Sequence, residues 1–159
     1  MTKTNAEYWI KHLGLQVHPE GGYFKEVYRA EEEIAETNLP SRYSGKRNIA
    51  TSIYYLLERG QVSQFHHLTS DETWVHIAGD PLTLHQFVPE GGYHKSTLGK
   101  DLLSGQTPQH TITRSTHFGA VTNDRYTLVA CFVAPGFDFK DFRFSDKKQL
   151  LQYFAFEQK

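Results

Sequence analysis

The chain has 159 residues, of which 14% are aromatic, and its formal net charge is −1 at pH 7. This length is typical of one domain with a hydrophobic core, so residues 1–159 are expected to form a single domain. Near-neutral charge without a basic block disfavours nucleic acid and membrane as partners, and no apolar run could span a bilayer. Cys131 is the single cysteine, which excludes an internal disulfide. Because the first residues are polar, we expect a soluble, cytoplasmic protein.

The N-terminal segment predicts a short helix followed by a loop and a strand. Thr4 and Glu7 have capping-box spacing, and Gly14 is a suitable stop for the helix. The loop contains Pro-Glu-Gly-Gly-Tyr at 19–23, a sequence that occurs again at 89–93, where a hairpin turn is expected. Residues 23–29 alternate as a strand, with Tyr23 and Arg29 on the same face, and residues 31–44 read as an exposed acidic and polar loop.

From residue 48 onward, short β-type runs alternate with turn signals. The expected strands cover 49–57, 62–68, 72–78, 82–88, 93–98, 118–121, 126–133 and 139–144, with a further strand around Ile112. Strands of this length and spacing predict an all-β sandwich or barrel. Ser145 and Asp146 are expected to cap a C-terminal helix that runs through Phe154.

Polar side chains recur with strand periodicity between two glycine turns, Gly60 and Gly79. Every second residue of a strand shares a face, which groups Gln64, His66 and Leu68, and likewise Glu72, Trp74 and His76. If both groups face the barrel interior, their polar atoms require partners or a ligand. Periodicity alone leaves the opposite faces, with Phe65, His67, Thr73, Val75 and Ile77 inside, as an equal alternative.

This stretch resembles the first signature of the cupin superfamily, Gly-x5-His-x-His-x3–4-Glu-x6-Gly. Gly60, His66, Glu72 and Gly79 fall in place, whereas Leu68 stands where the pattern has its second histidine. From about residue 13 to 144 the chain is similar to one cupin family, cupin-5 or domain of unknown function 985. The matching segments are 15–23, 51–57, 63–66, 71–74, 78–81 and 133–139.

The resemblance implies a double-stranded β-helix, or jelly-roll, barrel that commonly pairs as a homodimer, with His66 and Glu72 facing inward. Metal-binding cupins use two His and a Glu from the first signature and a His from the second. Here Leu68 replaces one ligand, and Phe118 stands at the place of the last, with His117 one residue early. Two remaining ligands are too few for a catalytic metal, and His76 lies about 13 Å along an extended strand, so no metal and no cofactor are expected.

Without a metal, the same groups suit acid–base chemistry on a small polar metabolite. We expect His66 and Glu72 to be catalytic, with His66 as general base in a sugar or sugar-nucleotide epimerase or isomerase, by analogy with metal-free cupins. Ligand contacts are expected from Ser63, Gln64, Trp74, His76 and Phe118, and from Tyr54 as an aromatic platform for a sugar or nucleotide base.

Glu20 and Tyr23 are expected to join the pocket because the family keeps a charged residue in a loop that needs glycines alone to turn. The loop would close the barrel mouth, of this chain or of a neighbour, or else be a strand-entry turn with a surface glutamate. Two other functions stay open: a binding protein without chemistry and a metal-dependent cupin enzyme.

Overall fold

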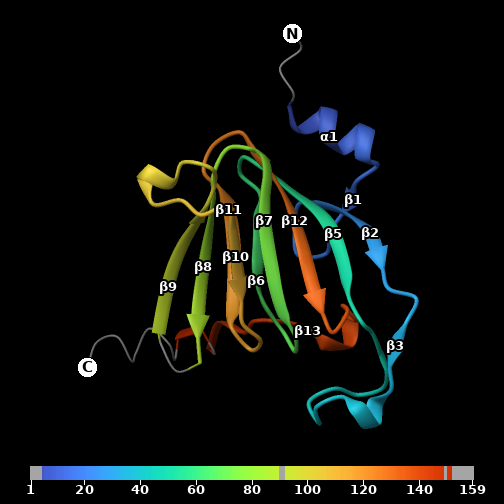
Figure 1. Ribbon diagram of the computed structural model, residues 1–159. Coiled ribbons are helices and arrows are strands. Elements are labelled where there is room, and N and C mark those ends of the chain that lie inside the picture. The colour runs from blue at the N-terminus through green and yellow to red at the C-terminus, as the bar shows by residue number, and fades with distance from the viewer. Residues whose placement is uncertain (1–4, 90–91, 149, 152–159) are drawn as a thin grey trace.

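Two antiparallel β-sheets packed face to face form the body of the protein, for which a computed structural model describes residues 5–89, 92–148 and 150–151 (Figure 1). One sheet has six strands in the order β1-β2-β5-β12-β7-β10. Their bounds are β1 Gln16–Val17, β2 Tyr23–Arg29, β5 Thr51–Glu58, β12 Tyr126–Ala134, β7 Asp71–Gly79 and β10 Gln109–Ile112. The other has five, in the order β13-β6-β11-β8-β9. These are β13 Phe142–Phe144, β6 Val62–Leu68, β11 His117–Thr122, β8 Leu82–Val88 and β9 Gly92–Leu98.

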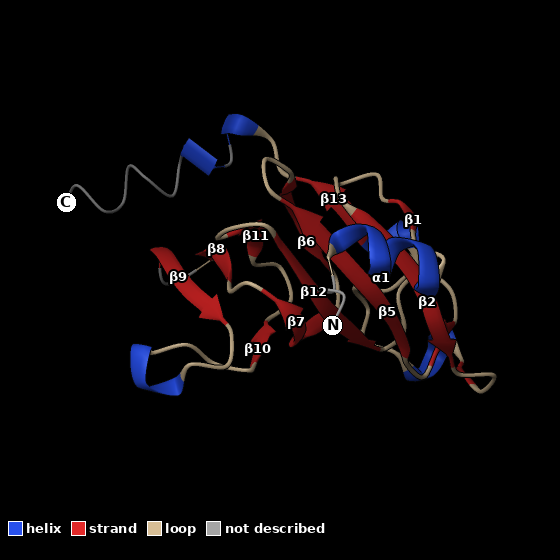
Figure 2. Ribbon diagram, turned by 90° about the horizontal axis from the view of Figure 1, so that it is seen from above, coloured by secondary structure: helices blue, strands red, loops and turns tan. Residues whose placement is uncertain are grey.

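Short elements connect and flank the sheets. Helix α1 (Ala6–Leu13) lies outside the six-stranded sheet, over β5 and β2 (Figure 2). A small ribbon of β3 (Glu33–Ile34) and β4 (Arg47–Asn48), and three 3₁₀ turns, complete the fold: η1 Glu36–Asn38, η2 Leu102–Ser104 and η3 Phe139–Asp141. This is the all-β jelly-roll barrel that the strand pattern and the family resemblance predict. No helix among the described residues has the length and apolar character needed to cross a membrane.

The main core lies between the two sheets. It is built from alternate residues of the strands, including Leu57, Trp74, Leu84, Phe118 and Val129. A second cluster, with Leu56 and Leu128, lies beneath α1 on the outer face of the six-stranded sheet. Successive residues Leu56 and Leu57 therefore serve different cores, as the two-residue period of a strand requires.

Two register shifts decide which side chains face the interior. In β2, Glu26 pairs with Ile53 and Tyr28 with Ser52, so Val27 is a bulge. The extra residue brings Arg29 onto the face that carries Glu26, whereas strict alternation predicted that Arg29 would share the face of Tyr23. Between β6 and β11, His66 pairs with Phe118 and Ser63 pairs with Ala120. Three residue steps on β6 therefore match two on β11, so β6 carries one extra residue between these pairs.

The predicted elements are mostly confirmed, with differences at the ends. The helix cap is Asn5, whose side chain accepts from the Tyr8 N–H, while Thr4 lies outside the described residues. The hairpin between β8 and β9 is formed, although Glu90 and Gly91 of the second Pro-Glu-Gly-Gly-Tyr copy are not among the described residues.

The structure also differs from the prediction in the strand expected at 139–144 and in the loop expected at 31–44. Residues 139–144 begin as the 3₁₀ turn η3 before β13, so the strand is shorter than predicted. The segment 31–44 is exposed at its glutamates but buries Tyr43, which the loop prediction missed. Asp146 caps the C-terminal helical turn through the Lys148 N–H, and the predicted extension to Phe154 falls outside the described residues.

Candidate functional site

A cavity of about 360 Å³ opens next to the main core, with which it shares Cys131. Its polar lining comes from His18, Glu20, Glu26, Arg29, Thr51, His66, Glu72, Cys131 and Asp138. Its apolar lining comes from Phe24, Ile53, Leu68, Val133, Phe137, Phe139 and Phe142. A cavity of this volume is at the small end of ligand pockets, which span about 300–1,000 Å³.

The loop between β1 and β2 carries Glu20 into the barrel. Its backbone is held by Tyr55, whose hydroxyl donates to the Gly21 carbonyl at 2.7 Å. Gly21 has φ of 109°, and a Cβ there would lie 2.1 Å from the carbonyl oxygen of Val62. The glycine is therefore required both by its conformation and by the close approach of β6. Glu20 is 5% exposed, so the loop is not a simple strand-entry turn with a surface glutamate.

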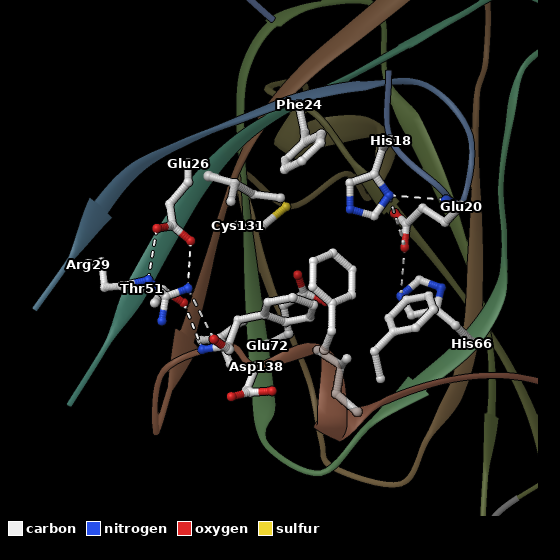
Figure 3. Close-up of a pocket in the computed structure, with 16 residues that line it drawn as sticks. His18, Glu20, Phe24, Glu26, Arg29, Thr51, His66, Glu72, Cys131 and Asp138 are labelled. Atoms are coloured by element: carbon white, nitrogen blue, oxygen red, sulfur yellow. Dashed lines mark hydrogen bonds and ion pairs between the residues drawn. The ribbon is translucent and has the colours of Figure 1, made fainter. Parts of the chain in front are cut away.

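Glu20 and His66 form a buried pair at one side of the cavity (Figure 3). His66 Nδ1 lies 2.7 Å from the Gln64 carbonyl oxygen, which can only accept, so Nδ1 carries a proton. The other ring nitrogen, Nε2, lies 3.2 Å from Glu20 Oε2. Ser63 donates its hydroxyl to the second carboxyl oxygen of Glu20 at 3.1 Å. The neutral His66 ring therefore has its proton on Nδ1 and a lone pair on Nε2. This lone pair faces the Glu20 carboxyl, which is protonated.

Burial shifts both groups of this pair toward their neutral forms. It raises the pKa of Glu20 to about 8, against the opposing effect of the hydrogen bond from Ser63. It lowers the pKa of His66 to about 4, although the contact with the Gln64 carbonyl opposes the change. At neutral pH one proton is thus shared between the carboxyl and the imidazole.

His18 adds a second imidazole beside the pair. Its Nδ1 accepts the backbone N–H of Glu20 at 3.1 Å, which leaves the proton of the neutral ring on Nε2, on the cavity side (Figure 3). Burial, together with the charge of His66, lowers the pKa of His18 to about 4. His18 therefore offers the cavity an uncharged N–H donor.

Glu72 projects into the middle of the cavity from β7 (Figure 3). Burial, followed by repulsion from Glu20, raises the pKa of its carboxyl to about 8. The indole N–H of Trp74 points toward this carboxyl and opposes the shift, but it has no acceptor at hydrogen-bonding distance. No hydrogen bond or ion pair joins Glu72 to His66 in the described part of the chain; the carboxyl that contacts His66 is that of Glu20.

Arg29 and Glu26 lie on the other side of the cavity (Figure 3). The guanidinium donates to both carboxylate oxygens of Glu26, at 2.8 and 2.7 Å. Its other contacts are the Asn48 side-chain oxygen and the Phe137 carbonyl. Phe137 belongs to the segment that supplies Asp138, Phe139 and Phe142, and this segment forms the aromatic wall of the cavity.

Several residues predicted to bind ligand do not line this cavity. Tyr23 and Tyr54 pack against the cluster beneath α1, on the outer face of the sheet. Successive strand residues point to opposite faces, so it is their neighbours Phe24 and Tyr55 that point to the interior. Gln64 is exposed, since the register shift in β6 separates its face from that of His66.

Other predicted residues are buried next to the site. Ser63 supports Glu20, and Phe118 packs on the His66 ring with centroids 4.1 Å apart. Trp74 is 1% exposed and lies in the main core beside Phe118. His76 shares the face of Glu72 and Trp74, as predicted, but it lines a separate hollow, and its Nε2 lies 3.1 Å from the Asp80 carbonyl.

The donor set does not fit the metal centre of metal-binding cupins. Leu68 and Phe118 place hydrocarbon where two ligands would be, and His117 turns to the other face, where it contacts Ser145. His66 Nε2, the nitrogen that would bind a metal, is in contact with Glu20. Across the described residues, no three His, Cys, Asp or Glu side chains are grouped to hold a metal ion.

The sequence did not predict that the cavity would be lined by His18, Glu26, Arg29 and Asp138. His18 had a usable signal, because it stands two residues before Glu20 in the same loop motif. Glu26 and Arg29 had none, since the bulge at Val27 alters the face that simple alternation assigns to Arg29.

The jelly-roll sheets and a polar cavity between them define this protein as a cupin. The sequence pattern described as Cupin superfamily (DUF985) matches residues 7–145, and the chain belongs to this family. A hypothetical protein from Leishmania major has TM-score 0.85 and 33% identity, over 98% of this chain and 95% of its own. A protein from Shewanella oneidensis has TM-score 0.83 and 39% identity, over 98% and 94%. No curated protein matches the chain.

More distant structures share the fold alone. Oxalate decarboxylase from Bacillus subtilis has TM-score 0.57 at 13% identity, over 87% of this chain and 34% of its own. The likeness supports the jelly-roll assignment and carries no residue roles across.

Proposed function

We propose that this cupin catalyses proton transfer on a small carbonyl compound of monosaccharide size, as in an isomerase or epimerase, without a metal. The observation that carries the proposal is the buried Glu20–His66 pair at the wall of the cavity, with Nε2 of His66 3.2 Å from Glu20 Oε2. A pair that holds one proton between a carboxyl and an imidazole can give that proton up and take another back.

Each residue of the pair has a distinct part in this chemistry. Glu20, with its pKa raised to about 8, acts as the acid that protonates the substrate carbonyl oxygen. Loss of this proton leaves a Glu20 carboxylate beside neutral His66. The carboxylate then accepts the proton from the substrate carbon next to the carbonyl group. His66 works through Glu20, so the base is the pair and not His66 alone as the sequence suggested. The Nε2–H of His18 is available to hold the substrate oxygen while charge develops on it.

The lack of an unpaired cation in the lining favours a sugar over a sugar-nucleotide. The lining contains four carboxyl side chains and one guanidinium, and Arg29 is already paired with Glu26. A diphosphate would therefore find no unpaired positive side chain there. The cavity volume of about 360 Å³ supports the same choice.

The test is hydrogen exchange at the carbon beside the carbonyl. The protein is incubated with a panel of aldoses and ketoses in D₂O, and loss of the proton signal is followed by NMR. We expect exchange with at least one sugar, and a fall of about 100-fold or more in Glu20→Gln and His66→Gln, in line with general acid–base catalysis. His67→Gln is the matched control, because His67 precedes Leu68 on the same strand but lies outside the cavity lining.

Two results would contradict the proposal. Exchange that persists at full rate in both Glu20→Gln and His66→Gln would remove the pair from the chemistry. Absence of exchange with every sugar in the panel would leave a binding protein without chemistry as the better account.

A further inference from the structure

The cavity lining contains more carboxyl groups than Arg or Lys side chains. Carboxyl side chains at its lining come from β2, β7, the loop before β2 and the aromatic segment, whereas Arg29 is the one Arg or Lys that lines it among the described residues. The two histidines, His18 and His66, do not add positive charge near neutral pH because burial lowers the pKa of each to about 4.

The guanidinium of Arg29 is already paired within the protein. Arg29 donates through Nε and one terminal nitrogen to Glu26, and through the other terminal nitrogen to Asn48. The two parallel contacts with Glu26 match the guanidinium to the carboxylate and occupy two of its nitrogen donors. An anionic ligand would therefore enter next to carboxyl groups with no unpaired cation to meet it.

Glu72 is the carboxyl that the protein itself leaves unmatched. It is 8% exposed. The indole N–H of Trp74 is directed at it but does not come within hydrogen-bonding distance. Its carboxyl lies between the Glu20–His66 pair and the Arg29–Glu26 pair, inside the cavity (Figure 3). The carboxyl oxygens face the cavity, where a ligand can donate to them, and behind them Trp74 Nε1 is a buried donor without an acceptor.

The aromatic side chains of the lining favour a positively charged ligand. Phe24, Phe137, Phe139 and Phe142 surround the cavity with aromatic side chains. Phe137 and Phe139 meet edge to face with ring centroids 5.0 Å apart. The faces of aromatic rings attract cations, and this attraction is larger where water is excluded.

We infer that the cavity binds a small molecule with a protonated amine, whose ammonium group lies against Glu72. An ammonium supplies the donors and the positive charge that Glu72 lacks, and it stabilises the ionised carboxylate against the cost of burial. The inference deepens the proposed function, on which it rests for the reacting carbonyl group. The substrate class becomes an amino sugar or a similar amino carbonyl compound, with the amine at Glu72 and the reacting carbon at the Glu20–His66 pair.

The test compares sugars that differ in charge on the same ring. Dissociation constants for glucosamine, N-acetylglucosamine and glucuronate are measured by calorimetry at pH 6.5. We expect glucosamine to bind at least about tenfold more tightly than either of the others, as one charge-assisted contact allows. In Glu72→Gln, which keeps the shape of the side chain, the advantage should fall to within about twofold. Glu36→Gln, which removes a carboxylate from the exposed turn η1, should leave it unchanged.

The outcome that overturns the inference is the absence of an amine advantage in the wild-type protein, whether all three sugars bind alike or none binds. An advantage that survives in Glu72→Gln would also overturn it, because the ammonium would then lie elsewhere. Binding to Glu20→Gln separates this inference from the proposed function. Amine preference should persist there although exchange is lost, so either proposal can fail without the other.

Discussion

Replacing Glu72 with glutamine should make the protein more stable at high pH and change the pH dependence of its stability. Glutamine resembles the neutral carboxyl in shape, so the cavity wall is kept while the ionisable group is removed. In the folded protein burial, and then repulsion from Glu20, raises the pKa of Glu72 to about 8. In the unfolded chain it titrates near 4.3, as glutamate does in water.

The sign follows from proton binding. Between these two pKa values the folded state holds more protons than the unfolded state, so stability falls as pH rises and stops falling above about 8. His18 and His66, with lowered pKa values, act in the opposite direction, but their contribution is complete by about pH 6.5. The carboxyl effect is therefore clearest from pH 6.5 to 8.

The expected size can be worked from this window. About 1.5 pH units at about 1.36 kcal/mol per unit gives about 2 kcal/mol for Glu72. Urea unfolding at pH 6.5, 7, 8 and 9 measures it for the wild type and for Glu72→Gln. The variant should gain about 2 kcal/mol relative to the wild type between pH 6.5 and 9. Parallel stability curves for the two proteins would refute the raised pKa, and with it the description of Glu72 as a buried, unmatched carboxyl.

Two further predictions concern the loop and the thiol. Gly60→Ala, at positive φ but in open space, should cost about 1 kcal/mol in urea unfolding, and Gly21→Ala should cost about 1–3 kcal/mol more than that, because its Cβ would strike the Val62 carbonyl. Equal losses for the two variants would show that β6 does not constrain the loop. Burial raises the pKa of the Cys131 thiol, so an aromatic disulfide reagent at pH 8 should react slowly with the native protein and fully after denaturation. Rapid native labelling would contradict a buried thiol.

The strands could be predicted from the sequence because their signals are local. Glycine and proline turns delimit each strand, and alternation assigns most faces. β2, β6 and β8 have the predicted ends, and Glu72, Trp74 and His76 share the buried face as expected. The replacement of metal ligands by Leu68 and Phe118 was also visible in the sequence, because a motif defines which residue stands at each ligand position.

The partner of His66 could not be predicted in the same way. Glu72 is six residues away, whereas Glu20 lies on a separate loop and reaches His66 only because Gly21 and Tyr55 hold that loop against β6 and β5. No periodicity within one strand carries this information, since the contact joins segments 46 positions apart.

The faces of individual side chains show the same division between local and tertiary information. Local sequence determined that Tyr23 and Phe24 point in opposite directions, but it did not determine which of them faces the cavity. That choice depends on where α1 packs, and α1 covers the side that carries Tyr23. The bulge at Val27 is likewise fixed by pairing with β5, and it brings Arg29 beside Glu26. The sequence alone determined the barrel and the loss of the metal ligands. The packing of the loop, the helix and the bulged strand against the barrel determined which acids and bases share the cavity, because contacts between distant segments exist only in the folded chain.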